Sequence, residues 1–330
     1  MRVAINGFGR IGRMTAKILL AQSDIELVAV NDLADPKTLT HLFKYDSVHG
    51  NLNLPLRLED TTLHAGSHQL KFYQEKDPAL LPWRELKIDV VIEATGIFKT
   101  EILASKHLVA GAQKVIISAP SPDLTIPMLV FGVNGDVLSK EMQIVSNASC
   151  TTNSAAPLIA LLDEICEIES CYITTVHSYT GDQRLHDAPH RDLRRARAAG
   201  QSIVPTTTGA AKALTRIFPH LDDKIGGCGI RVPVPDGSLT DITCIVKNVL
   251  STDEINAAFK SAAESRFKGI LEYTSDPIVS VDVIGNTHSC VFDSQLTSVI
   301  GKMVKLVGWY DNEIGYSNRL VDLLRKMSSL

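Results

Sequence analysis

Residues 7–12 read Gly-Phe-Gly-Arg-Ile-Gly, and this segment constrains the fold of the chain more than any other. It follows a short apolar run of β type and opens a helical pattern. In such a strand–turn–helix unit, Gly7 permits the tight turn, Gly9 lets backbone approach a pyrophosphate, and Gly12 lets helix and strand pack closely. The helix N-terminus adds unpaired N–H groups and the positive end of a dipole. The segment therefore predicts a dinucleotide-binding α/β unit.

The first third of the chain continues this alternation of short apolar strands and helical patterns. Alternation of this kind predicts parallel βαβ units, and nearly continuous apolar strands fit a sheet that helices cover on both faces. Strands are expected at residues 3–5, 27–30, 89–92, 114–117 and 143–145, and helices at 11–20, 38–45 and 100–110.

The pattern changes at residue 150, where a long helical segment is followed by strands with polar connections. This predicts a second domain of α+β type with a mostly antiparallel sheet beside the Rossmann-type parallel sheet of the first. Because 330 residues exceed the usual size of a single core, we expect two domains, residues 1–149 with 313–330, and residues 150–312. Strands are expected in the second half at 172–177, 229–232, 240–247, 279–284 and 305–310, and a last helix at 312–328.

Asp32 follows Gly12 by about 20 residues and ends the second expected strand. A carboxylate at this place binds the ribose 2′-hydroxyl of NAD and repels the 2′-phosphate of NADP. The alternative is a glycine turn that binds no ligand, which is common for an isolated motif of this type. The strand, the helix and the acid together favour a NAD site.

Composition argues against several other classes of function. The formal net charge of −4 supplies no field for nucleic acid or an anionic membrane, and no segment has the apolar length of a membrane span. The first residues show no signal-peptide features. The six cysteines are too sparse for a disulfide scaffold and form no Cys-x-x-Cys pair. We therefore expect a cytoplasmic protein with no metal site and no nucleic-acid or membrane partner.

Cys150 is the one cysteine that lies in a polar cluster, residues 146–153, between an expected strand and the start of the long helix. A helix dipole and unpaired N–H groups stabilise a thiolate, so we expect a depressed pKa and a nucleophilic sulfur. The other five cysteines lie in apolar or strand contexts, where a small buried hydrophobe is the simpler interpretation.

A nucleophilic cysteine needs a base or a cationic partner, and His177, at the end of an expected strand, has the best position among ten histidines. A single histidine at a strand end is more often structural, so the residues alone leave both roles open. A thiolate beside a nicotinamide still limits the chemistry, because an aldehyde gives up hydride only after something has added to its carbonyl. The resulting hemithioacetal can pass hydride to NAD and become a thioester.

Polar residues near Cys150 favour release of this thioester by phosphate rather than by water. Residues 206–212 read Thr-Thr-Thr-Gly-Ala-Ala-Lys and open another helix, whose N-terminus can bind an anion. Ser149, Thr151 and Thr180 offer further hydroxyl donors. Bidentate charge could come from Arg194, Arg195, Arg197 and Arg231. A solvated loop or a subunit contact is the alternative explanation of this Arg-rich stretch.

Five segments together resemble the glyceraldehyde-3-phosphate dehydrogenase family, and the resemblance extends over nearly the whole chain. They are residues 5–13, 44–47, 146–153, 206–212 and 309–313, the last reading Trp-Tyr-Asp-Asn-Glu. The resemblance implies NAD-dependent, phosphorylating oxidation of glyceraldehyde 3-phosphate to 1,3-bisphosphoglycerate, in glycolysis or gluconeogenesis. It also implies a homotetramer whose long loop, residues 178–201, lies at subunit contacts.

The resemblance assigns roles to individual residues. Cys150 is implied as the nucleophile and His177 as its activating partner. The expected phosphate-binding residues are Ser149, Thr151, Thr208, Gly209 and Arg231 for one group, and Thr180 and Arg195 for the other. The expected NAD-binding residues are Gly7, Gly9, Arg10, Ile11, Gly12, Asp32, Ser118 and Asn312, with Lys76 by the adenine, where an arginine is common.

Two alternatives remain. Erythrose-4-phosphate dehydrogenase shares the Ser-Cys-Thr-Thr-Asn segment but usually lacks the Thr-Thr-Thr-Gly at residues 206–209. A catalytically silent, NAD-binding regulatory protein would keep the same fold. The presence of both Cys150 and His177 favours an enzyme over this second alternative.

Overall fold

The alternating first part of the chain forms a twisted sheet in the computed structural model, which describes residues 1–330. The sheet has eight strands in the order β3-β4-β5-β2-β1-β6-β7-β8. It belongs to a compact unit of Met1–Leu129, Gly135–Ala148 and Ser317–Leu330. Its strands are β1 (Arg2–Asn6), β2 (Glu26–Asn31), β3 (Leu56–Glu59), β4 (Thr62–Ala65), β5 (His68–Tyr73), β6 (Val90–Glu93), β7 (Lys114–Ile117) and β8 (Ile144–Ser146).

Parallel pairing runs without interruption from β5 to β8, as the alternation predicts. The inner strands are buried along almost their whole length, because helices cover them. The antiparallel meander β3-β4-β5 at one edge was not predicted. The helices of this unit are α1 (Arg10–Leu20), α2 (Pro36–Lys44), α3 (Glu101–Ala104), α4 (Lys106–Val109) and most of α8 (Ile314–Ser328).

The helix expected at residues 100–110 is divided into α3 and α4. Thr100 caps the first piece by accepting from the backbone N–H of Leu103. The division falls at Ser105, whose hydroxyl donates to the carbonyl of Ile102. Side-chain bonding of this kind competes with the regular helical pattern.

The second compact unit comprises Val130–Asn134 and Ser149–Tyr316. Its sheet has the order β10-β11-β9-β12-β16-β14-β13, and β15 pairs with β16. The pairs β11–β9 and β13–β14 are parallel, and the others are antiparallel, so the predicted mostly antiparallel sheet is confirmed. Its strands are β9 (Ile168–Ser178), β10 (Val204–Thr206), β11 (Ile225–Val232), β12 (Ser238–Val246), β13 (Leu271–Thr274), β14 (Cys290–Asp293), β15 (Ser298–Ile300) and β16 (Met303–Tyr310).

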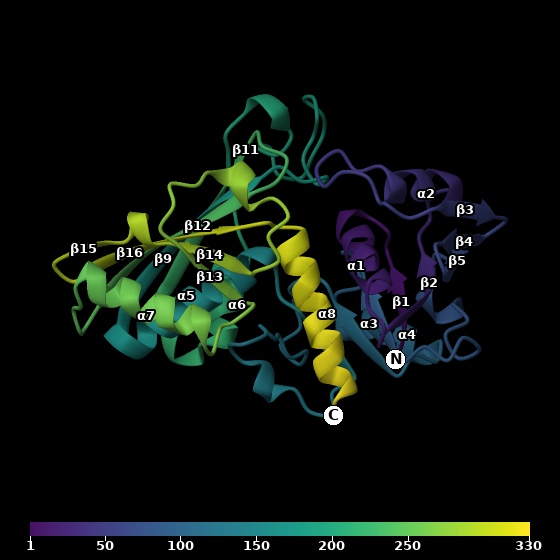
Figure 1. Ribbon diagram of the computed structural model, residues 1–330, viewed down its shortest axis with the longest axis horizontal. Coiled ribbons are helices and arrows are strands. Elements are labelled where there is room, and N and C mark those ends of the chain that lie inside the picture. Colours follow the sequence, from purple (N-terminus) through teal and green to yellow (C-terminus); the bar gives the residue numbers. More distant parts are fainter. The chain divides into compact units, whose positions relative to one another are not determined.

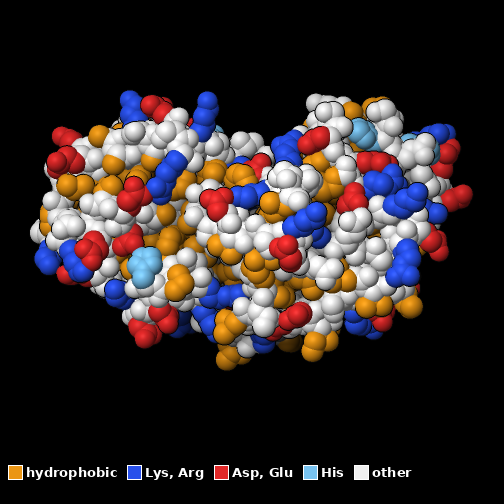
Figure 2. Space-filling model, turned by 90° about the horizontal axis from the view of Figure 1, so that it is seen from below, with side chains coloured by type: hydrophobic (Ala, Val, Ile, Leu, Met, Phe, Trp, Pro, Cys, Tyr) orange, Lys and Arg blue, Asp and Glu red, His pale blue; other side chains and the backbone are white.

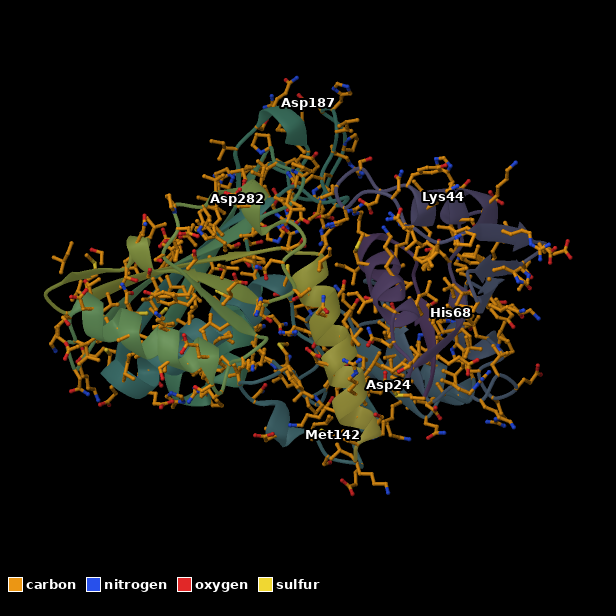
Figure 3. All side chains as sticks on the ribbon, viewed as in Figure 1. Asp24, Lys44, His68, Met142, Asp187 and Asp282 are labelled. Atoms are coloured by element: carbon orange, nitrogen blue, oxygen red, sulfur yellow. The ribbon has the colours of Figure 1, made fainter.

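Three helices lie on one face of this second sheet, α5 (Cys150–Cys166), α6 (Ala210–Ile217) and α7 (Thr252–Glu264) (Figure 1). The long connection between β9 and β10 extends away from the sheet, with Asp187 near its tip (Figure 3). Side chains of both charge signs are interspersed over the face in Figure 2. None of the helices combines the length and the apolar character that crossing a bilayer requires.

The strand expected at residues 279–284 is wrong: this segment is a short 3₁₀ helix, η5 (Ser280–Val283). Its alternating Val and Ile residues imitate a strand pattern. Asp282 decides the conformation, because its carboxylate accepts from the backbone N–H of Val279 at 2.8 Å and closes the turn. Val279 and Val281 consequently lie exposed.

Candidate active site

A cavity of about 690 Å³ opens at the carboxyl ends of β1, β2 and β6 in the first unit. Ligands of parallel α/β sheets bind at such strand ends, outside the sheet. Four of the predicted NAD-binding residues line it: Gly7, Gly9, Asp32 and Lys76. The other lining residues are Asn6, Asn31, Leu33, Glu75, Asp77, Ala94, Thr95, Ile97, Phe98 and Lys106.

The glycine turn that ends β1 has the shape that the motif predicts. Gly7 has φ +97°, and a Cβ there would lie 2.7 Å from backbone atoms of Ala94 and Thr95. A Cβ on Gly12 would collide with the carbonyl oxygen of Gly7, so α1 packs directly on the turn. Nothing lies within 4 Å of the corresponding position on Gly9. The turn therefore leaves open space where a pyrophosphate approaches the start of α1.

Asp32 lies directly after β2 and is connected to this turn. Its carboxylate accepts from the backbone N–H of Phe8 at 2.7 Å and from that of Ala34 at 2.9 Å. Two acceptor oxygens keep further lone pairs for hydroxyl groups. The turn, the open space above Gly9 and this carboxylate together fit the pyrophosphate and ribose of NAD.

The remaining predicted NAD-binding residues of this unit do not line the cavity. Arg10 begins α1 and pairs with the buried Asp46 at 2.9 Å. Ile11 is the next residue of α1 and is partly buried. Ser118 follows β7, and its N–H donates to the carbonyl of Glu93 at 2.9 Å.

Cys150 and His177 are brought together in the second unit. Ser149 caps α5 by accepting from the N–H of Thr152 at 3.1 Å, so Cys150 is the first helical residue. His177 lies at the end of β9, and its Nε2 is 3.4 Å from the Sγ of Cys150. The spatial pairing expected of a thiol and its base is present.

Arg231 supports the far side of the His177 ring. Parallel pairing of β11 with β9 sets Arg231 directly opposite His177. The carbonyl of Ser178 lies 2.8 Å from His177 Nδ1 and accepts from Arg231 Nη1 at 2.9 Å. Arg231 Nη1 also lies 2.9 Å from Nδ1, so an acceptor and a donor both face this nitrogen, while Nε2 faces the thiol.

The pKa expectation for Cys150 is wrong in sign. Although part of the residue reaches solvent, burial raises the pKa of its thiol, and Arg231 and the N–H of Thr151 offset this only in part. Burial, followed by the charge of Arg231, lowers the pKa of His177 to about 3. Burial therefore disfavours the charged form of each group taken alone. Proton transfer from Sγ to Nε2 creates both charges together, and their mutual attraction lowers its cost.

Thr151 and Tyr310 contact each other beside this pair. The Tyr310 hydroxyl lies 2.9 Å from the hydroxyl of Thr151 and 3.0 Å from that of Thr175. The ring of His177 meets that of Tyr310 edge to face at 6.0 Å. Burial raises the pKa of Tyr310, so it stays a neutral phenol. Tyr310 was missed as a site residue because nothing in the local sequence connects it to Cys150.

The other predicted phosphate-binding residues lie at the start of α6, in the long connection and just beyond β9. Thr208 and Gly209 precede α6, and the Thr208 hydroxyl accepts from the N–H of Ala210 at 3.2 Å. Arg195 pairs with Asp182 and donates to Thr206 at 3.0 Å, so its charge is already partly balanced. Thr180 lies just beyond β9 and is partly buried.

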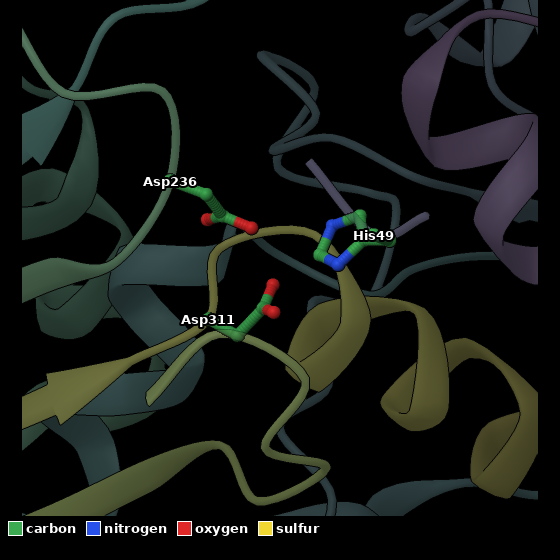
Figure 4. A group of neighbouring side chains, drawn as sticks. All are labelled: His49, Asp236 and Asp311. Atoms are coloured by element: carbon green, nitrogen blue, oxygen red, sulfur yellow. The ribbon is translucent and has the colours of Figure 1, made fainter. Parts of the chain in front are cut away.

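Asn312 is buried in the second unit with a fixed amide orientation. Its Oδ1 accepts from Ser178 at 2.8 Å and from Ser238 at 2.6 Å, which turns the amide nitrogen the other way. Its backbone N–H donates to Asp236 at 3.2 Å, and the carboxyl groups of Asp236 and Asp311 project toward one another (Figure 4). Burial and the neighbouring Asp236 raise the pKa of Asp311 to about 7.

A dinucleotide-binding sheet and a Cys–His pair define the class of NAD-dependent oxidoreductases that react through a thiol. The family model for the glyceraldehyde 3-phosphate dehydrogenase NAD binding domain matches residues 1–101, and that for the C-terminal domain matches residues 149–312. The chain therefore belongs to the glyceraldehyde-3-phosphate dehydrogenase family. The predicted family, the predicted fold class and the prediction of NAD as the cofactor are confirmed.

Curated relatives match over nearly the full length. Glyceraldehyde-3-phosphate dehydrogenase 2 of Streptomyces avermitilis is 52% identical over 326 residues, covering 98% of this chain and 97% of the relative. The Mycobacterium avium enzyme is 53% identical over 331 residues, covering 98% and 97%. That of Kitasatospora aureofaciens is 49% identical over 330 residues, covering 99% of both.

Proposed function

We propose that this chain oxidises D-glyceraldehyde 3-phosphate with NAD and inorganic phosphate to 1,3-bisphosphoglycerate, through a thioester on Cys150. The observation that carries this mechanism is the 3.4 Å approach of Cys150 Sγ to His177 Nε2 at the start of α5. When bound, NAD accepts the hydride that the substrate loses. Gly7, Gly9, Gly12 and Asp32 hold the dinucleotide, with Arg10, Ile11, Lys76 and Ser118 at its borders and Asn312 at the carboxamide.

The first step joins the substrate to the sulfur. Sγ attacks the aldehyde carbon as its proton passes to His177 Nε2, and the carbonyl electron pair moves to oxygen. The imidazolium returns the proton to that oxygen, which completes the hemithioacetal. Nδ1 faces the Ser178 carbonyl and the Arg231 guanidinium, so Nε2, which faces Sγ, is the ring nitrogen that transfers the proton.

The second step is the oxidation. His177 Nε2 takes the hydroxyl proton while hydride leaves the carbon, and a carbon–oxygen double bond forms. The product is a thioester on Cys150, with the proton held as imidazolium. Because burial lowers the pKa of His177, this proton is readily given back.

Phosphate then cleaves the thioester. A phosphate oxygen attacks the carbonyl carbon, the carbon–sulfur bond breaks, and the thiolate recovers its proton from His177. We propose that Ser149, Thr151, Thr208, Gly209 and Arg231 hold the attacking phosphate. We assign Thr180 and Arg195 to the phosphate group of the substrate.

We further propose a homotetramer in the cytoplasm. Leu185 and Leu193 of the long connection are 80% and 83% exposed, which suits an apolar subunit contact. All six cysteines are free, as in a reducing compartment. We assign residues 1–149 with 313–330 to the NAD-binding domain and 150–312 to the catalytic domain. Light scattering should give the mass of four chains, and the mass of one chain contradicts the assembly.

The reaction is tested by following NADH absorbance with the purified protein. Glyceraldehyde 3-phosphate and NAD should produce NADH at a multiple-turnover rate only when inorganic phosphate is added. Erythrose 4-phosphate serves as the matched substrate. Activity with erythrose 4-phosphate alone would overturn the assignment, and no turnover with either aldehyde would favour a regulatory protein.

A further inference from the structure

Glu93 carries a buried carboxylate that the proposed reaction does not use. It ends β6, is 1% exposed, and does not itself line the NAD cavity. Asn6, Asn31 and Glu93 occupy paired positions at the ends of β1, β2 and β6, because Asn6 is the register partner of both other residues. The three therefore form one row directly beneath the cavity.

Both oxygens of the Glu93 carboxylate accept hydrogen bonds. Oε2 accepts from Asn6 Nδ2 at 2.6 Å and lies 3.1 Å from His107 Nε2. Oε1 accepts from the N–H of Thr95 at 2.8 Å and from the Thr95 hydroxyl. A buried carboxylate is stable without a cation only when its lone pairs are satisfied in this way.

Groups that can only donate fix the direction of these bonds. The indole N–H of Trp83 donates to His107 Nδ1 at 3.1 Å, so Nε2 of this fully buried histidine carries the proton and donates to Glu93. On the other side, the N–H of Glu75 donates to Asn31 Oδ1 at 2.8 Å. Asn31 Nδ2 then faces Asn6 Oδ1 at 2.7 Å, which turns Asn6 Nδ2 toward Glu93.

The residues held by this network form the walls of the cavity. Asn6, Asn31, Glu75 and Thr95 all line it, and Thr95 lies against the glycine turn. Asn31 Nδ2 also donates to the carbonyl of Glu75 at 2.9 Å, next to Lys76. One carboxylate thus orients the floor of the cavity from the glycine turn to the loop that carries Lys76.

We propose that Glu93 is a positioning residue for NAD, whose carboxylate orders Asn6, Asn31 and Thr95 into the shape that binds the dinucleotide. This inference rests on the proposed use of the cavity for NAD. Glu93 does not line the cavity and therefore acts on NAD only through these neighbours. We therefore expect Glu93 to change the affinity for NAD and not the rate of the thiol chemistry in the other unit.

The test is Glu93→Gln. This variant keeps the size of the side chain but places an amide N–H₂ group against either the donors of Asn6 and His107 or those of Thr95. The dissociation constant for NAD, measured by titration calorimetry, should rise about tenfold, and KM for NAD should rise with it. kcat at saturating NAD and KM for glyceraldehyde 3-phosphate should change less than about twofold. Glu101→Gln is the matched control, because Glu101 is exposed in the same unit and should leave NAD affinity unchanged.

An unchanged NAD dissociation constant in a folded Glu93→Gln protein overturns the proposal, even when its unfolding temperature falls. A roughly tenfold fall in kcat with an unchanged NAD dissociation constant also overturns it. If Glu93→Gln does not fold, His107→Gln replaces it, since His107 lies behind Glu93 and does not line the cavity. Its NAD dissociation constant should rise about threefold, and no rise overturns the proposal. Failure of the proposed function would appear instead in the wild-type protein, as absent turnover despite normal NAD binding.

Discussion

The first unit builds its cavity from the ends of neighbouring parallel strands, whereas the second builds its reactive pair from a helix start and a strand end 27 residues apart. In the cavity and directly behind it, buried polar groups such as Asn6 and Glu93 have donors and acceptors matched in fixed directions. In the reactive pair, burial disfavours the charged forms of Cys150 and His177. The comparison shows two uses of buried polar groups. At the binding cavity they keep their protons and hold a fixed shape, whereas in the reactive pair they exchange a proton during the reaction.

The largest expected effect comes from Cys150→Ser. It removes the nucleophile of the second unit and should lower kcat by about 10⁴-fold or more, while NAD affinity stays within about twofold. NADH absorbance and calorimetric titration measure the two quantities. Cys228→Ser is the control, because Cys228 is the other partly exposed cysteine, and it should keep full activity. Undiminished turnover of Cys150→Ser would remove the thioester from the mechanism.

His177→Asn should give the next largest loss, about 10³-fold in kcat, because no base faces Sγ. Alkylation of Cys150 by iodoacetamide at neutral pH should also slow, since the raised thiol pKa then has no proton acceptor beside it. Peptide mapping locates the label. His220→Asn changes an exposed histidine and serves as the control. Equal alkylation rates in the His177 variant and the wild type would show that the histidine does not activate the thiol.

Asp32→Asn changes the NAD cavity of the first unit and should affect binding instead of the thiol chemistry. Loss of the carboxylate should lower the preference for NAD over NADP about tenfold, with the rate at saturating NAD nearly unchanged. The ratio of kcat/KM for the two cofactors is the measurement. Asp35→Asn removes one charge nearby and keeps a capping side chain for α2, so its ratio should stay at the wild-type value. A similar fall in both variants would point to general charge instead of a ribose contact.

The smallest effect concerns stability and pH. Well above pH 6.5, His177 is neutral in both folded and unfolded states and contributes no pH dependence. Below pH 6.5, the unfolded chain binds a proton that the folded protein, with a pKa of about 3, does not, so stability is lost as pH falls. The loss should be about 1 kcal/mol at pH 5.5. Urea unfolding of wild type and His177→Asn at pH 7 and 5.5 measures it, and identical pH responses would contradict it.

The glycine turn, Asp32 and the start of α5 could be predicted because their signals are local. Each depends on a few residues in one strand–turn–helix segment. The position of Cys150 at a helix start could be predicted in the same way, but the sign of its pKa shift could not. That sign depends on how much protein surrounds the sulfur, because burial outweighs Arg231 and the N–H of Thr151.

The contacts that sequence analysis missed depend on pairing between distant segments. Arg231 faces His177 only because β11 lies beside β9, and Tyr310 reaches Thr151 from the last strand of the second sheet. Asn6 and Glu93 became visible as a pair only through the register of β1 and β6. The 3₁₀ turn at Val279 was misinterpreted because one capping aspartate outweighed an alternating pattern.

The parallel pairing of β11 with β9 also bears on how the chain acquires its reactivity. No short turn joins these strands, so the loop between Ser178 and Ile225 must be closed before Arg231 can support His177. The helix that begins with Cys150 can form from local contacts well before that closure. A chain still in the course of folding therefore carries a protonated sulfur whose base is not yet held in place. The protein therefore becomes active only after β11 has paired with β9. In a refolding experiment, recovered activity reports this pairing more faithfully than recovered helix content does.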